Sequence, residues 1–176
     1  MRALLASAAA VITLAAAMPA SAVTTIFFTG LTSAGEPVPT STATGAAIVS
    51  FDNVASTVTV QVSFQGLANT SPFGHIHCCT AVPATGSAPV SLSFTPLPAV
   101  TTGTYSNVFA LTPAAFNTLL AGASAGQAYV NLHTPGTYAG GEIRGFLSAV
   151  PEPGSYALML VGLGVLGWAA SRRRAA

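Results

Sequence analysis

The stretch Thr57–Gln65 reads Thr-Val-Thr-Val-Gln-Val-Ser-Phe-Gln, a strict alternation of polar and apolar residues. Successive side chains of a β-strand point to opposite faces, so the apolar residues share one face and the polar residues share the other. This pattern predicts an antiparallel strand with one buried face. Asp52 and Asn53 form a turn signal just before it, which makes residues 46–51 the preceding arm of a hairpin.

Similar short apolar stretches recur along the chain, separated by spacers rich in Gly, Pro, Ser and Thr. They predict an all-β fold, an antiparallel β-sandwich with Greek-key, immunoglobulin-like connections. The further strands are expected at residues 24–29, 73–77, 91–95, 103–110, 128–133 and 142–147.

One short helix is expected to interrupt these strands. Thr112 is a good N-cap, Pro113 suits the first helical position, and Gly122 suits the C-terminal stop. The apolar residues of this segment form a one-sided stripe, which predicts that the helix covers the core. They are Phe116, Leu119 and Leu120.

The chain carries little charge, which excludes one class of function. Charged residues make up 5% of the sequence, against about 25% in a typical soluble domain. Within residues 23–149 they are Glu36, Asp52, Glu142 and Arg144, and there is no lysine. A nucleic-acid-binding surface needs a basic patch, so no nucleic-acid partner is expected. No motif of a serine hydrolase, zinc protease or phosphate-binding loop occurs either, so we expect no enzyme.

Residues 1–22 have the three parts of a secretory signal peptide. Met1 and Arg2 provide the positive start, residues 3–17 the apolar centre, and the triplet at 20–22 the small residues of a cleavage site. We expect signal peptidase to cut after Ala22; an uncleaved N-terminal anchor is the alternative. Residues 23–149 are then one exported domain of ordinary size.

Residues 150–176 contain three further parts in a defined order. The apolar run would cover about 23 Å as a helix, against a hydrocarbon core of about 30 Å, so we expect a single membrane-spanning helix whose flanking arginines reach the headgroups. Because translocation of arginine is costly, the C-terminus should stay cytoplasmic. A buried core helix is the alternative. The parts are Val150-Pro151-Glu152-Pro153, the apolar run 156–170, and Arg172-Arg173-Arg174.

This order resembles the PEP-CTERM sorting signal of Gram-negative bacteria. The resemblance implies that an exosortase-type enzyme is a partner and processes the tail. The protein would then be anchored transiently in the inner membrane before it reaches the cell envelope or the outside.

Residues able to bind a metal gather in two segments of the exported domain. His75 and His77 lie two residues apart, so they share one face of a strand. If the strand that ends at His133 pairs with the strand that begins near Glu142, three histidines and an acid converge. Imidazole nitrogens bind copper and zinc, so these histidines are candidate ligands for Cu or Zn, with Glu142 as an additional one. The alternative is a hydrogen-bonded polar layer that holds loops together.

Cys78 and Cys79 are the only cysteines and are adjacent in the sequence. In an oxidising compartment three states remain open: a vicinal disulfide, an intermolecular disulfide, or thiolate ligands to the same metal. A vicinal bond is strained, because neighbouring Cα atoms across a trans peptide are about 3.8 Å apart, below the usual range of about 4.4–6.8 Å.

Several of these segments resemble the CHRD domain, a family named from chordin and common among secreted bacterial proteins. The resemblance covers nearly all of residues 23–147 and implies an extracellular β-sandwich. At Cys78 and Cys79 the chain departs from the many members that continue with glycine and proline. The matching segments are His-Ile-His at 75–77, Tyr-Val-Asn-Leu-His-Thr at 129–134, Gly-Gly-Glu-Ile-Arg-Gly-Phe-Leu at 140–147, and the opening stretches 35–40 and 42–45.

Two hypotheses about function follow. The leading one is a non-catalytic exported surface or matrix protein, associated with exopolysaccharide, biofilm or other surface proteins. The competing one is an extracytoplasmic copper- or zinc-binding or redox protein that uses the histidine cluster.

Overall fold

The computed structural model describes residues 24–70, 72–150 and 159–166. The predicted signal peptide, residues 151–153 of the sorting motif and the arginine cluster lie outside the described residues, as does part of the predicted membrane-spanning segment. A short helical segment covers residues 159–166. No helix within the described ranges has the length and apolar character needed to cross a membrane.

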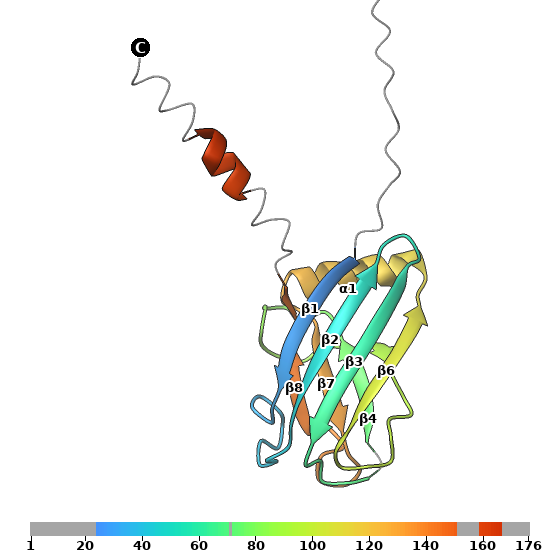
Figure 1. Ribbon diagram of the computed structural model, residues 1–176. Coiled ribbons are helices and arrows are strands. Elements are labelled where there is room, and N and C mark those ends of the chain that lie inside the picture. Colours follow the sequence, from blue (N-terminus) through green and yellow to red (C-terminus); the bar gives the residue numbers. More distant parts are fainter. Residues whose placement is uncertain (1–23, 71, 151–158, 167–176) are drawn as a thin grey trace, which may run out of the picture.

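The domain consists of two antiparallel sheets packed face to face, with one helix across one end (Figure 1). The strands of the larger sheet run in the order β6-β3-β2-β1-β9, and those of the smaller sheet in the order β5-β4-β7-β8. The strands are β1 Thr24–Leu31, β2 Thr44–Asp52, β3 Thr57–Gln65, β4 Phe73–His77, β5 Val90–Ser93, β6 Gly103–Ala110, β7 Tyr129–His133, β8 Ile143–Phe146 and β9 Ser148–Ala149.

The two-sheet architecture confirms the predicted antiparallel sandwich. Immunoglobulin sheets have the strand orders ABED and CFG. The neighbours β2-β3-β6 and β4-β7-β8 have the same connectivity as A-B-E and C-F-G. The larger sheet contains two additional strands, β1 and β9, which extend it on the side of β2. The sequence pattern predicts no strand after residue 147, so the short strand β9 is an element that it missed.

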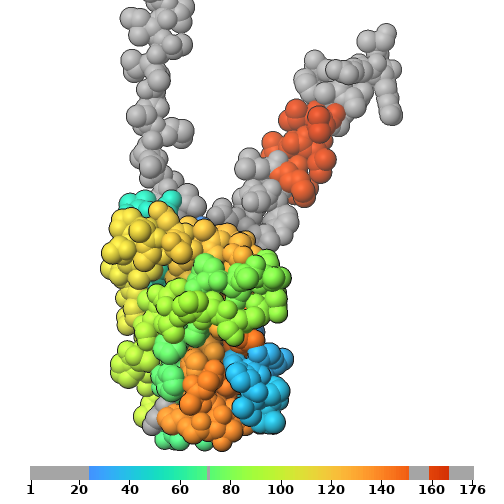
Figure 2. Space-filling model, turned by 180° about the vertical axis from the view of Figure 1, so that it is seen from behind, coloured from blue at the N-terminus to red at the C-terminus, as the bar shows by residue number. Residues whose placement is uncertain are grey.

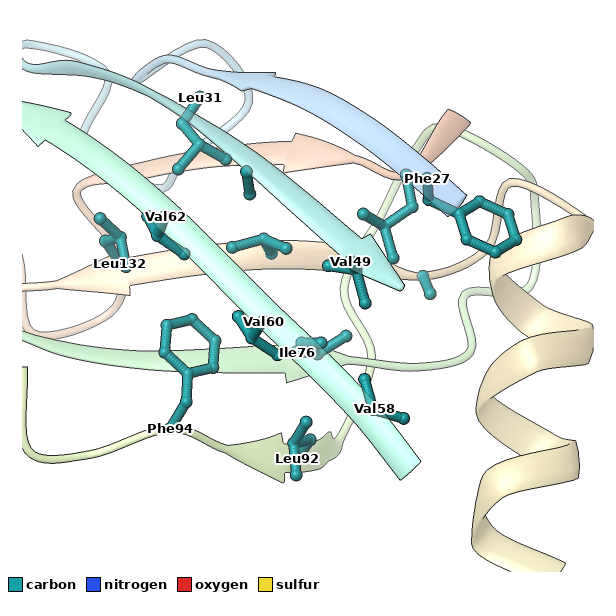
Figure 3. Packing of buried hydrophobic residues seen from close by; sticks show 14 of the residues in the cluster. Phe27, Leu31, Val49, Val58, Val60, Val62, Ile76, Leu92, Phe94 and Leu132 are labelled. Atoms are coloured by element: carbon teal, nitrogen blue, oxygen red, sulfur yellow. The ribbon is translucent and has the colours of Figure 1, made fainter. Parts of the chain in front are cut away.

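Strand β3 supplies one side of the core, as its alternation predicts. Val58, Val60, Val62 and Phe64 are buried, whereas the polar residues between them are partly or fully exposed. The apolar residues face Ile76 of β4 and the other inward residues of the smaller sheet (Figure 3). Full burial of each such side chain contributes about 1.5–3 kcal/mol, so this one strand is a large part of the hydrophobic stabilisation.

Helix α1 (Pro113–Ser124) begins where predicted, because the side chain of Thr112 accepts a hydrogen bond from the Ala115 amide. The predicted stop at Gly122 is wrong. The helix continues past this residue and ends before Gly126, whose φ of +69° suits glycine. Gly122 is buried inside the helix, where an added Cβ would lie 2.2 Å from Cys78 Sγ and 2.3 Å from Cys79 Sγ. Its role is therefore to let the helix approach the cysteines.

Candidate metal centre

The three histidines lie on the outer face of the smaller sheet. The antiparallel register places Phe73 opposite His133, His75 opposite Asn131, and His77 opposite Tyr129. Ile76, between the two histidines of β4, points into the core, so His75 and His77 point the other way. The residues 129–146, coloured orange in Figure 2, form much of this face, and green and blue segments lie against them.

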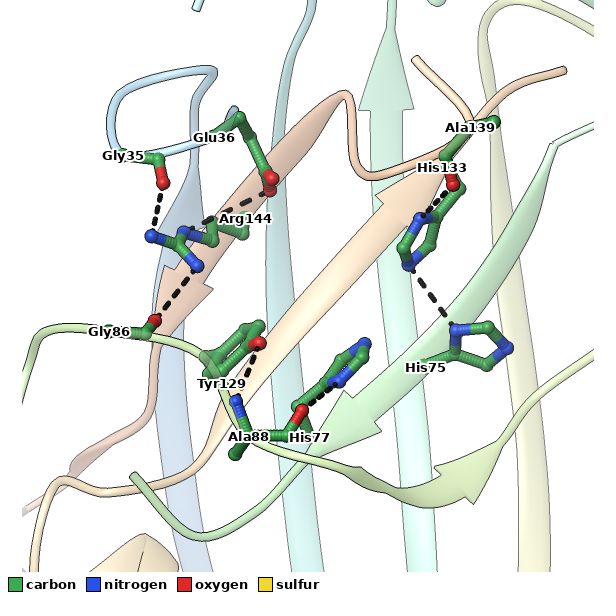
Figure 4. A network of polar contacts seen from close by, with 10 residues as sticks. All are labelled: Gly35, Glu36, His75, His77, Gly86, Ala88, Tyr129, His133, Ala139 and Arg144. Carbon is green, nitrogen blue, oxygen red and sulfur yellow. Dashed lines mark hydrogen bonds and ion pairs between the residues drawn. The ribbon is translucent and has the colours of Figure 1, made fainter. Parts of the chain in front are cut away.

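The imidazole rings of this face approach one another closely (Figure 4). His75 Nδ1 lies 3.3 Å from His133 Nε2. One nitrogen from each of His75, His77 and His133 lies within 4.8 Å of the others. Pairing of β4 with β7 thus produces the three-histidine convergence that the sequence pattern suggested.

Two of the rings are oriented by backbone carbonyls. His77 Nδ1 lies 2.8 Å from the carbonyl oxygen of Ala88, and His133 Nδ1 lies 3.1 Å from that of Ala139. A carbonyl oxygen only accepts, so each Nδ1 donates its hydrogen and leaves the lone pair of the neutral ring on Nε2. His77 Nε2 is buried without a hydrogen-bond partner. A metal-binding histidine is commonly oriented in this way, with one ring nitrogen on a backbone carbonyl and the other free for the ion.

Burial keeps the rings neutral. It lowers the pKa of His133 from 6.5 to about 4, with the nearby His75 and His77 adding to the effect and the Ala139 carbonyl opposing it. The pKa values of His75 and His77 are also lowered, in each case chiefly by burial. At neutral pH the rings therefore carry lone pairs and no charge: the lone pair of His77 Nε2 has no partner, and that of His133 Nε2 accepts the hydrogen of His75 Nδ1.

Aromatic rings fix the positions of the same two imidazoles. Phe73 stacks on His133 with ring centroids 4.8 Å apart, and Tyr129 stacks on His77 at the same distance of 4.8 Å. The interplanar angles of 5° and 2° show that both pairs are parallel. The rings of His77 and His133 are thus held by a stack on one face and by a carbonyl at Nδ1.

The additional ligands suggested by the sequence do not belong to this site. Cys78 and Cys79 form a disulfide in the structure, so neither offers a thiolate. Glu142 is completely buried, but its Oε1 accepts from Ser41 Oγ at 2.7 Å and from the Ala68 amide at 2.9 Å. Its Oε2 accepts from Thr134 Oγ1. Glu142 therefore joins three loops, and its inclusion among the metal ligands is wrong.

Three further residues lie on this side of the molecule and were not assigned to a site from the sequence: Asn131, Arg144 and Glu36. Arg144 lies opposite Asn131 on β8, on the side away from His75. Glu36 lies in the loop between β1 and β2, with its Oε1 4.0 Å from Arg144 Nε. Among the described residues, the buried side-chain atoms without a hydrogen-bond partner are His77 Nε2, Asn131 Oδ1 and both carboxylate oxygens of Glu36.

Two family models match the chain, one over the β-sandwich and one over the residues that follow it. A family model of the CHRD domain matches residues 27–147, and a model of the PEP-CTERM protein-sorting motif matches residues 149–174. The chain belongs to the CHRD domain family, and its sorting motif implies export, processing by an exosortase and sorting to the cell surface. No curated protein and no solved structure matches the chain.

Proposed function

We propose that this chain is a non-catalytic cell-surface protein whose CHRD domain binds one copper or zinc ion through His75, His77 and His133. The observation that carries the proposal is the orientation of two rings. His77 and His133 each commit Nδ1 to a backbone carbonyl, and His77 is left with a buried Nε2 that has no partner. A buried polar atom without a partner is costly, and a bound cation would remove that cost.

The donor set determines which ions fit. Three neutral imidazoles suit copper and zinc, and copper generally binds nitrogen sites more tightly. Metal–nitrogen bonds of about 2.0–2.1 Å place tetrahedral ligands roughly 3–3.5 Å apart. The 3.3 Å between His75 Nδ1 and His133 Nε2 has this length, although without metal it is a hydrogen bond in which His75 Nδ1 donates. To bind through Nδ1, His75 would carry its hydrogen on Nε2 instead. The three ligand nitrogens now lie within 4.8 Å of one another, and binding would bring the His77 nitrogen closer to the other two. Three protein ligands would leave a fourth position for water or an external ligand.

The test is metal analysis of the exported protein, followed by calorimetric titration of the metal-free form with Cu²⁺ and Zn²⁺. We expect one ion per chain, lost when His77 and His133 are both replaced by Gln. Asp52→Asn is the matched control: it removes an acidic group on the other sheet and should leave the stoichiometry unchanged. A wild-type protein that binds neither metal would show that the cluster is only a hydrogen-bonded polar layer.

A second function, association with neutral exopolysaccharide, is favoured by the outer face of the larger sheet. Ile26, Phe28 and Ile48 are exposed there, beside the hydroxyl and amide side chains of β3. The only charged residue in the strands of this sheet is Asp52, at the end of β2. Such a face offers apolar and hydrogen-bonding contacts without charge, which suits an uncharged polymer.

This association can be tested by co-sedimentation with exopolysaccharide from the producing cells. Phe28→Glu places a charge among the exposed apolar residues, opposite Ile48, and should abolish binding. Val54→Glu, in an exposed turn, is the control and should bind normally. Equal binding of both variants, or no binding of the wild type, would exclude this face as the contact.

A further inference from the structure

We infer that Arg144 is a positioning residue for the proposed metal centre: it holds the loop 78–89 so that the Ala88 carbonyl orients His77. The inference rests on the proposed function, because it assigns a role to a residue that itself donates no ligand atom. It is carried by a closed chain of contacts that starts and ends at the guanidinium group (Figure 4).

The first contacts tie two loops to β8. Arg144 Nη1 donates to the carbonyl oxygen of Gly86 at 3.1 Å, and Nη2 donates to the carbonyl oxygen of Gly35. Glu36, the residue after Gly35, places its carboxylate 4.0 Å from Arg144 Nε. One side chain therefore fastens the loop between β4 and β5 and the loop between β1 and β2 to the same strand.

The Gly86 contact is one of several hydrogen bonds that hold the loop between β4 and β5; the Ala84 amide also donates to the Gly126 carbonyl oxygen at 2.9 Å. Residues 81–87 are all exposed, so the loop has little packing of its own to hold it. Ala88 follows directly, and its carbonyl oxygen is the acceptor for His77 Nδ1 at 2.8 Å. Displacement of Gly86 would therefore move the atom that keeps the hydrogen on His77 Nδ1.

Tyr129 closes the chain of contacts. Its hydroxyl accepts from the Ala88 amide at 3.3 Å, and its ring stacks on His77 with centroids 4.8 Å apart. The guanidinium carbon of Arg144 lies 5.1 Å from the centre of the same ring. Arg144 thus holds both the loop above His77 and the aromatic ring beside it. No comparable contact links Arg144 to His133, whose carbonyl partner is Ala139 in another loop.

The first experiment needs no metal. Ring ¹⁵N NMR of the metal-free protein reports which nitrogen of each histidine carries hydrogen. In the wild type we expect the Nδ1–H form at both His77 and His133. Arg144→Met should give a mixture of forms at His77 and leave His133 unchanged, while Arg144→Lys, which retains a donor, should restore part of the wild-type signal. Glu36→Gln is the matched control, because it removes the ion pair but keeps both carbonyl contacts, and it should match the wild type.

The second experiment measures the affinity of each variant for Cu²⁺ and Zn²⁺. Loss of an orienting partner typically weakens metal binding by about 10–100-fold. We expect a loss of this size for Arg144→Met, a smaller loss for Arg144→Lys, and none for Glu36→Gln. Amide spectra confirm that each variant is folded; if Arg144→Met is not, Arg144→Lys against Glu36→Gln gives the same comparison.

The two experiments separate the inference from the function on which it rests. If the wild type binds no metal but His77 changes form in Arg144→Met, the proposed function fails while the orienting role of Arg144 is upheld. If His77 keeps its Nδ1–H form in the Arg144 variants, the positioning role is overturned, whether or not the protein binds metal. Equal changes at His77 and His133 would also overturn it, because they would indicate a general loosening of the sheet.

Discussion

Within the described part of the chain, Glu36 is the residue with two buried side-chain atoms that lack a hydrogen-bond partner. Its side chain is 1% exposed, and neither carboxylate oxygen has a hydrogen-bond partner. Gly141 permits this placement, because an added Cβ there would lie 2.1 Å from Glu36 Oε2. Burial raises the pKa of Glu36 from 4.5 to about 7, and the attraction of Arg144 offsets only part of the shift. A fraction of the molecules therefore carries a neutral Glu36 at physiological pH.

Replacement of Glu36 by Gln should change how stability depends on pH. The pKa of Glu36 is higher in the folded state than in the unfolded state, so the folded state binds more protons between pH 4.5 and 7. The free energy of unfolding should therefore fall as pH rises through this range, by roughly 3 kcal/mol at most. Relative to the wild type, Glu36→Gln should be more stable at pH 8 than at pH 5 in urea unfolding.

His133 does not disturb this comparison. Its lowered pKa acts in the opposite direction, since stability is lost as pH falls from 6.5 towards 4, but it does so equally in both proteins. The same stability difference between variant and wild type at pH 5 and pH 8 would show that Glu36 is ionised throughout.

At the scale of the element, β3 shows how alternation distributes stability. Val60 has no exposed surface, whereas the neighbouring Thr59 lies on the outer face and is partly exposed. The two residues differ little in size, so exchanging valine and threonine tests which face is buried.

Val60→Thr should lower the free energy of unfolding by about 1–3 kcal/mol, because it places a hydroxyl without a partner in the core. Thr59→Val should change it by less than about 0.5 kcal/mol. Chemical denaturation of both variants measures the difference. Equal costs at the two positions would contradict the register of this strand.

The contact between α1 and the disulfide gives a second prediction at this scale. In an exposed helix, Gly→Ala stabilises by about 1 kcal/mol. At Gly122 the added Cβ would lie 2.2 Å and 2.3 Å from the two sulfurs, and overpacking of this kind typically costs about 1–3 kcal/mol. We therefore expect Gly122→Ala to lower the melting temperature. Gly30→Ala, whose Cβ would meet nothing within 4 Å, is the control and should leave it nearly unchanged. A rise in melting temperature for Gly122→Ala would show that the helix does not press on the cysteines.

At the scale of the whole molecule, both ends of the domain lie at the same side of the larger sheet. Phe27 of β1 pairs with Ala149 of β9, so the chain enters and leaves the sandwich along neighbouring strands (Figure 1). The matched sorting motif begins at residue 149, at the end of β9. The last strand of the domain therefore leads directly into the tail.

Processing of this tail should depend on the motif at residues 150–153. Proline restrains its own backbone and that of the preceding residue, so Pro151 and Pro153 favour an extended segment accessible to an enzyme. Pro151→Ala and Glu152→Ala should each leave the tail attached, which the mass of the exported protein would reveal. Wild-type masses for both variants would mean that the motif is a passive spacer.

The sequence by itself determined the class of fold and most of the strands. Thr57–Gln65 forms β3 at the predicted residues, because a period of two with one apolar face leaves a strand few alternatives. The same parity argument placed His75 and His77 on one face. The sequence also identified the sorting tail, whose signal lies in local residue order and needs no tertiary contact.

Only the tertiary structure decided which polar groups meet. Gly122 resembles a helix stop in the sequence, and only packing against Cys78 and Cys79 reveals it as a close contact. Glu142 lies close to His133 along the chain, yet its oxygens accept hydrogen bonds from Ser41, Ala68 and Thr134. The orientation of His77 depends on Ala88 and on Arg144, more than fifty residues further along the chain. Local patterns report which face of a strand is buried, but hydrogen bonds between distant loops arise only when the whole chain has folded.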